Sequence, residues 1–243
     1  MYNQYFDKVI SILNKIKESQ CDEIKQASNT LANTVEKGGI IHIFGTGHTQ
    51  AQVMEIFYRA GGLVPVNAIF TPAFSVYPCA PLSTFAERQE GFAKVILDAE
   101  TISENDCLII VSTAGRNAVP IDMAIEAKKR GMTVIGLVSR KFCNEVSSRH
   151  SSGYKFTDVL DIVVDDHSEV GDAVMTIEGF ESKVGATSSI ASCTILQSMV
   201  TECVNTLVNK GINPPVWTSS NVDGGDEINQ RYLQEYKSKV RCL

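Results

Sequence analysis

The chain has 243 residues, of which 44% are hydrophobic and 21% charged, and its mean hydropathy is close to zero. Such a composition can bury a sizeable core and excludes a wholly disordered chain. The formal net charge is −6, and the lysines and arginines are scattered, so no basic surface for a nucleic acid is expected. No apolar run reaches the roughly 18 to 20 residues of a membrane span, and Met1–Ile10 lacks the apolar stretch of a signal peptide. We therefore expect a cytoplasmic protein that has no membrane partner.

The periodicity of apolar residues predicts alternating helices and strands in a single domain that spans 1–243. Two helical segments are expected within 1–37, a core within about 35–210 and a helical extension within 211–243. The expected strands are 40–44, 63–66, 107–112, 132–138 and 159–164, and the expected helices after the first two are 49–60, 84–99, 119–130, 190–208 and 228–240. This alternation predicts an α/β fold with a mainly parallel sheet covered by helices on both faces.

Two polar turns follow predicted strands, at the sheet edge where open parallel sheets bind ligands. They are Gly45-Thr46-Gly47-His48-Thr49 and Ser112-Thr113-Ala114-Gly115-Arg116-Asn117. Glycines allow close backbone approach, and a helix N-terminus that follows such a turn attracts an anion, so together the turns could surround one phosphate. Either turn alone could equally serve only to cap the helix that follows it.

Known nucleotide and metal signatures do not fit the chain. Gln50 stands where a dinucleotide-binding turn has its third glycine, no acidic residue follows Val66-Asn67, and no P-loop pattern occurs. Seven cysteines show no Cys-x-x-Cys spacing and are expected to be free thiols. The four histidines are scattered and the acidic residues do not cluster with them, so we expect no metal site and no cofactor.

The two turns, together with the later segment Gly185–Ser189, resemble the sugar isomerase (SIS) domain family over about residues 35–210. Two further segments, Ser147–Gly153 and Asp165–Ala173, are similar to a stand-alone branch of that family, itself similar to phosphoheptose isomerase and N-acetylmuramic acid 6-phosphate etherase. The resemblance implies a flavodoxin-like, three-layer α/β/α fold with a five-stranded parallel sheet. It also implies a phosphosugar site near a subunit interface.

By position, the resemblance implies that the two turns and the later serine bind the substrate. The implied binding residues are Gly45, Thr46, Gly47, His48, Thr49, Ser112, Thr113, Gly115, Arg116, Asn117 and Ser188. The second turn departs from the family pattern, because Ala114 replaces the middle serine and Asn117 the last hydroxyl residue. Arg116 or the backbone can compensate for the lost phosphate contact.

Isomerisation of an aldose to a ketose needs a base beside the carbonyl and a second group that moves hydroxyl protons. Glu87 and Glu90 lie three residues apart in the predicted helix 84–99, and either could be the base. Glu87 could instead close a capping box on Thr84, and Glu90 could be a solvated helix residue. His48 and His167 are candidate acids or bases, with capping and simple surface exposure as their alternatives, whereas His42 is expected to be a satisfied core histidine.

These observations predict a sugar-phosphate isomerase that acts on a phosphorylated sugar or amino sugar and uses no cofactor. Two alternatives stay open: a lyase of the etherase type, which starts with the same proton abstraction, and a non-catalytic phosphosugar sensor. The apolar faces of the terminal helices and of 190–208 exceed what one sheet face covers, so we expect a homodimer or homotetramer.

Overall fold

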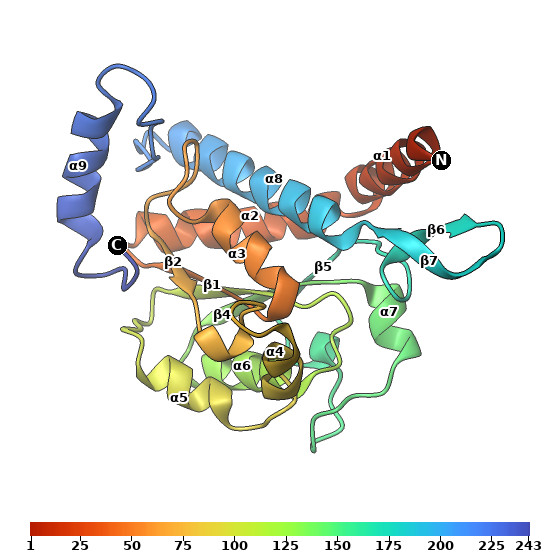
Figure 1. The fold of residues 1–243 in the computed structure, drawn as a ribbon. Helices are drawn as coiled ribbons and strands as arrows, with labels where there is room; N and C mark the ends of the chain where they lie inside the picture. Colours follow the sequence, from red (N-terminus) through yellow and green to blue (C-terminus); the bar gives the residue numbers. More distant parts are fainter.

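The structure is a computed structural model that describes residues 1–243. Its centre is a parallel sheet with the strand order β2-β1-β3-β4-β5, as in flavodoxin-like folds (Figure 1). The strands are β1 (Ile41–Gly45), β2 (Val66–Ile69), β3 (Cys107–Val111), β4 (Thr133–Val138) and β5 (Ile162–Asp165). The predicted five-stranded parallel sheet is therefore confirmed.

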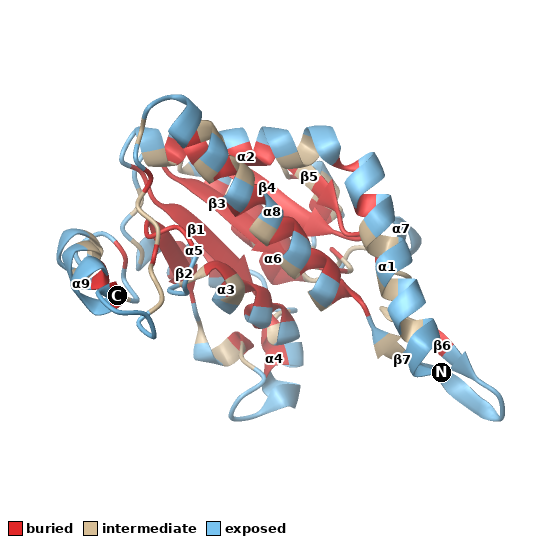
Figure 2. Ribbon diagram, turned by 90° about the horizontal axis from the view of Figure 1, so that it is seen from above, coloured by how far each residue is buried: buried red, intermediate tan, exposed pale blue.

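Apolar residues on both faces of the sheet explain why helices cover both sides. Every residue of β1, β2 and β3 is buried, which is typical of parallel strands between two helical layers (Figure 2). One layer consists of α2 (Cys21–Glu36), α3 (Gln50–Ile56) and α8 (Ser188–Asn209). The other consists mainly of α5 (Phe92–Asp98) and α6 (Ala118–Lys129). The three-layer α/β/α arrangement is thus as predicted.

Terminal additions extend this core at both ends of the sheet. The predicted terminal helices are present as α1 (Tyr2–Ser19) and α9 (Gly225–Tyr236). An antiparallel hairpin of β6 (Ala173–Ile177) and β7 (Phe180–Ala186), which we did not predict, projects beside α1 (Figure 1). The Tyr5 hydroxyl donates a hydrogen bond to the Ala186 carbonyl at 2.5 Å and joins the helix to the hairpin. None of the helices combines the length and the hydrophobicity that crossing a bilayer requires.

The predicted helix 84–99 is wrong, because the chain turns in its middle. Helix α4 (Ala80–Ala86) ends before Glu87, and α5 begins only after Gly91, whose φ of 88° lies in the left-handed region. The carboxylate of Asp122, on α6, accepts a hydrogen bond from the Gly91 backbone N–H at 2.7 Å and holds this turn. Thr84 consequently lies inside α4, so the expected capping box with Glu87 does not form.

Strand β2 also lies later than the predicted 63–66. Pro65 lacks an N–H, and the preceding Leu63 and Val64 pair with the segment that leads to α9. The other predicted elements agree with the structure to within a few residues, except that 49–60 ends early, at Ile56. Helix α7 (Arg140–Glu145) and the one-turn helices η1 (Gly47–Thr49), η2 (Pro72–Phe74) and η3 (Phe156–Asp158) complete the fold.

Candidate functional site

A cavity of about 420 Å³ lies beyond the carboxyl ends of β1 and β3, where the strand order reverses. Both predicted turns reach it, together with the end of α4, the start of α7 and the loop before β6. Its lining comprises Thr46, Gly47, His48, Thr49, Val76, Ala80, Ser83, Thr84, Glu87, Ser112, Thr113, Ala114, Asn117, Phe142, Gly171 and Asp172. The structure therefore brings the two turns together around one space, as expected for parallel strands that end at the same edge.

The first turn is held in shape by its own threonines. Thr49 Oγ1 accepts a hydrogen bond from the Thr46 backbone N–H and donates one to the Thr46 carbonyl, both at 2.8 Å. A Cβ at Gly45 would lie 2.6 Å from Thr49 Oγ1, so only glycine fits there. Gly47 has a φ of 59°, in the left-handed region, and the one-turn helix η1 that it begins lines the cavity. The Thr49 hydroxyl thus shapes the turn, while Gly47 and His48 line the cavity.

The second turn presents unpaired donors to the same space. The backbone N–H groups of Thr113, Ala114 and Asn117 donate to no protein acceptor. Thr113 is only 8% exposed, and its Oγ1 is buried without a hydrogen-bond partner. Buried polar groups are nearly always paired, so such a set indicates a place for a polar ligand. Gly115 does not line the cavity; its φ of 58° and close contact with Cys143 and Phe156 make it the structural glycine of the turn.

Glu87 lies between the turns as a consequence of the break between α4 and α5. The Thr46 hydroxyl donates a hydrogen bond of 2.7 Å to Glu87 Oε2. No donor in the protein contacts Glu87 Oε1, which leaves one carboxylate oxygen available within the cavity lining. The residue is half-buried and forms no ion pair. Glu87 is therefore a carboxylate with the freedom to accept a proton from a bound molecule.

Asp172 is the second carboxylate in the cavity lining, but its oxygens are occupied. Its Oδ1 accepts hydrogen bonds from the backbone N–H groups of Thr187 and Ser188, and its Oδ2 accepts one of 2.6 Å from Ser188 Oγ. The carboxylate thus caps the N-terminus of α8, where the helix dipole favours a negative charge. Ser188, a predicted substrate contact, is fully buried and lies behind Asp172 instead of lining the cavity.

Gly45 and three other predicted residues, Glu90, His167 and Arg116, also lie outside the cavity lining. Both oxygens of Glu90 accept hydrogen bonds from Ser151, through its backbone N–H and its hydroxyl, and these bonds lower the pKa of Glu90. The His167 ring lies between Ser19 Oγ at 2.7 Å and the Asp165 carboxylate at 3.2 Å, and partial burial lowers its pKa. Arg116 donates to the Ser147 carbonyl. His48, in contrast, lines the cavity with an exposed ring.

The sequence interpretation missed several lining residues. Asp172 lies in a segment that the family resemblance had marked, Asp165–Ala173, but no role was assigned to it. No sequence pattern placed Ser83 or Phe142 near a site, because neither the start of α4 nor any part of α7 was predicted. His42 is a satisfied core residue, as predicted: its ring lies 3.2 Å from Asp106 Oδ2 and 3.0 Å from Asn67 Nδ2.

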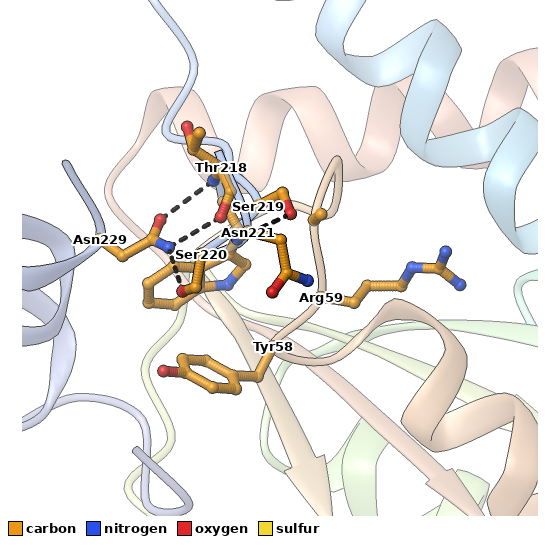
Figure 3. A pocket seen from close by; sticks show the side chains of 9 residues that line it. Tyr58, Arg59, Thr218, Ser219, Ser220, Asn221 and Asn229 are labelled. Carbon is orange, nitrogen blue, oxygen red and sulfur yellow. Dashed lines mark hydrogen bonds between the residues drawn. The ribbon is translucent and has the colours of Figure 1, made fainter. Parts of the chain in front are cut away.

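A smaller hollow of about 210 Å³ lies where α9 meets the body (Figure 3). Trp217 packs edge-on between Tyr58 and Tyr232, with ring centroids 4.9 and 6.0 Å away. The Asn229 side chain pairs with both the backbone N–H and the carbonyl of Thr218 (Figure 3). These aromatic and amide contacts attach α9 to the body of the protein.

Comparisons with known proteins agree with this architecture. Residues 4–139 match a family model described as "SIS domain". A UPF0309 protein of Geobacillus thermodenitrificans is 37% identical over 243 residues, which cover 100% of this chain and 98% of that protein. A UPF0309 protein of Caldanaerobacter subterraneus is 36% identical over 246 residues and is covered completely. A phosphoheptose isomerase structure from Francisella tularensis has a TM-score of 0.53 at 17% identity, covering 83% of this chain and 95% of that one. At this identity the likeness concerns the fold alone.

Proposed function

The chain belongs to the SIS domain family, and we propose that it binds a phosphorylated sugar in the cavity between its two turns and isomerises it by proton abstraction. The phosphate is the anchor, and the carboxylate of Glu87 is the base. One observation carries the proposal: a carboxylate with a free oxygen lies at the same cavity as a set of unpaired hydrogen-bond donors.

The phosphate is proposed to lie against the second turn. The unpaired N–H groups of Thr113, Ala114 and Asn117 and the unpaired hydroxyl of Thr113 are donors that suit phosphate oxygens. Asn117 is also the residue that precedes α6, whose N-terminus adds a positive dipole end. Ser112 lines the cavity beside them. These donors compensate for the family hydroxyls that Ala114 and Asn117 replace.

Glu87 is proposed to move the proton between neighbouring carbon atoms of the sugar. Its free Oε1 takes the proton from the carbon next to the carbonyl, which gives an enediol, and returns the proton to the former carbonyl carbon. The hydroxyl proton moves from one oxygen to the other, and the exposed ring of His48 is the proposed carrier. Every proton is conserved, and this transfer requires no cofactor. Phosphate binding away from the reacting carbons orients them toward the base.

Turnover is proposed over a purely sensing role because of the environment of Glu87. A carboxylate beside the proposed phosphate donors repels that phosphate, so phosphate binding does not account for its position, whereas proton transfer does. Thr46 holds this carboxylate in place through the 2.7 Å hydrogen bond, which fixes a base in one orientation. An etherase-type elimination begins with the same proton abstraction, so the assignment of Glu87 holds for both reactions.

A hydrogen-exchange experiment tests the proposed base. Incubating the protein with hexose 6-phosphates in D2O and following the proton next to the carbonyl by NMR reports abstraction even when no product accumulates. Glu87→Gln should slow exchange by about 10²-fold or more, the usual contribution of a general base, while phosphosugar binding persists.

Glu104→Gln is the matched control, because Glu104 is an exposed carboxylate outside the cavity. It should leave exchange unchanged. Undiminished exchange in Glu87→Gln would remove Glu87 from the chemistry. Binding without exchange in the wild type, across the whole panel, would favour the sensor.

A further inference from the structure

The loop Ser147–Gly153, which joins α7 to η3, is fixed by polar contacts that the proposed reaction does not use. Ser147 accepts hydrogen bonds from Arg116, through its carbonyl at 3.2 Å and its hydroxyl at 3.4 Å. Further along, Ser151 donates to Glu90, and the His150 ring lies 2.9 Å from the Asp122 carboxylate. These contacts attach the loop to the second turn, to α6 and to the turn between α4 and α5. The loop therefore has a defined position beside the cavity.

Arg149 is an exposed residue that this loop places against the second turn, next to the cavity lining. Its backbone N–H donates to the Arg116 carbonyl at 2.7 Å, and its guanidinium donates to Asn117 Oδ1 at 2.6 Å. Asn117 lines the cavity, and the Arg149 guanidinium lies directly behind it, outside the lining. Because a guanidinium has five N–H donors, the bond to Asn117 leaves donors available for another acceptor.

Positive charge gathers at this side of the cavity, where Arg88 and Arg116 lie close enough to act on Arg149. Arg88, Arg116 and Arg149 form no ion pair, and neither do Arg140 and Arg231, whereas the other arginines, Arg59, Arg130 and Arg241, each pair with a carboxylate. Partial burial lowers the pKa of Arg149, and the charges of Arg116 and Arg88 lower it further, while the Glu87 carboxylate acts in the opposite direction. In a chain with a net charge of −6, an arginine cluster of this kind is a local exception. An anion placed there would relieve the mutual repulsion.

We propose that Arg149 recognises a second anionic group on the phosphosugar, so that substrates with an acidic group in addition to the phosphate are preferred. This inference rests on the proposed function and narrows its substrate class. The phosphate occupies the unpaired donors of Thr113 and Ala114, and the second group, a carboxylate or another phosphate, pairs with the Arg149 guanidinium. Arg116 and Glu90 are positioning residues, because their hydrogen bonds hold the loop and so place the Arg149 guanidinium beside Asn117.

The test compares sugar phosphates that differ only in the second acidic group. Calorimetric titration at fixed ionic strength uses N-acetylglucosamine 6-phosphate against N-acetylmuramic acid 6-phosphate for a carboxylate. It uses fructose 6-phosphate against fructose 1,6-bisphosphate for a second phosphate. The wild type should bind one doubly acidic member at least about tenfold more tightly than its parent, the scale of one charge-assisted hydrogen bond. Arg149→Gln should abolish that preference and leave the affinity for the parent within about twofold.

Two further variants separate recognition from a structural role. Arg149→Lys keeps the charge and should retain part of the preference, since a lysine lacks the planar fork. Arg231→Gln removes the same charge from an exposed position on α9 and should change nothing. Equal affinities for both members of each pair in the wild type, or an equal loss for both in Arg149→Gln, would overturn the inference and leave phosphosugar binding intact. Failure of every phosphosugar to bind would overturn the proposed function as well.

Discussion

Asp166 is a buried carboxyl group whose ionisation the fold opposes. It follows β5 and has no solvent exposure. Its Oδ1 accepts a hydrogen bond of 2.9 Å from the Ser168 backbone N–H, and its Oδ2 accepts a longer one of 3.3 Å from Ser192 Oγ. Burial raises the pKa of Asp166 to about 7, the bonds to Ser168 oppose the rise, and the charges of Asp165 and Asp172 add to it. The group is therefore protonated in the folded chain below neutral pH.

This raised pKa makes stability depend on pH. Above the ordinary value of 3.8 the unfolded chain ionises Asp166, whereas the folded chain keeps its proton until about pH 7. The contribution of the group to stability is thus complete below the unfolded pKa and is lost as pH rises through the folded pKa. The total loss is about 4 kcal/mol, of which about 2.5 kcal/mol falls between pH 5 and pH 8.

Asp166→Asn removes the titration while an amide can keep both hydrogen bonds. Urea unfolding at pH 5 and pH 8 gives the free energy of unfolding of each protein. The advantage of the variant over the wild type should grow by about 2.5 kcal/mol from pH 5 to pH 8. Asp223→Asn, at an exposed loop position, should show no such growth. An advantage that is the same at both pH values would refute the argument that burial holds Asp166 in its protonated form.

Two more predictions concern the first turn and the terminal helix. Gly45→Ala places a Cβ 2.6 Å from Thr49 Oγ1 and 2.8 Å from the Thr49 carbonyl oxygen, so the turn must shift. Phosphosugar affinity in calorimetry should fall about tenfold or more, and an unchanged affinity would show that the turn does not shape the site. Tyr2, Phe6 and Ile10 form an exposed apolar stripe on α1, so light scattering should give a multiple of the 26.5 kDa chain mass. Phe6→Glu should lower that mass toward the monomer, and a monomeric wild type would contradict the prediction.

The sheet could be predicted because its strands are short apolar runs that are recognisable in the local sequence. Cys107–Val111 is a short, continuous apolar run, and burial on both faces is what such a run requires. The turns after β1 and β3 could be placed at one site for the same reason, since parallel strands end at one edge. The hairpin of β6 and β7 gave no such signal, because β7 has no buried residue and thus no apolar pattern to recognise.

The position of Glu87 could not be predicted, since it depends on a contact that is distant in sequence. The helix periodicity of 84–99 continues through Gly91, and only the hydrogen bond from Gly91 to Asp122 identifies the turn. That break separates Glu87 from Glu90, so that Glu87 lines the cavity and Glu90 binds Ser151 in the loop that carries Arg149. The contact between Arg149 and Asn117, which are 32 residues apart, likewise could not be predicted from local sequence patterns.

Titration calorimetry of the wild-type protein tests the central claim that the two turns bind the phosphate of a sugar. Hexose 6-phosphates and amino-sugar 6-phosphates are compared with their unphosphorylated parents under the same conditions. The account predicts saturable binding of at least one phosphorylated sugar and none of its parent, because the unpaired donors of the second turn have no acceptor without the phosphate. Equal binding of a sugar and its phosphate, or no binding of any phosphosugar at millimolar concentration, would contradict it.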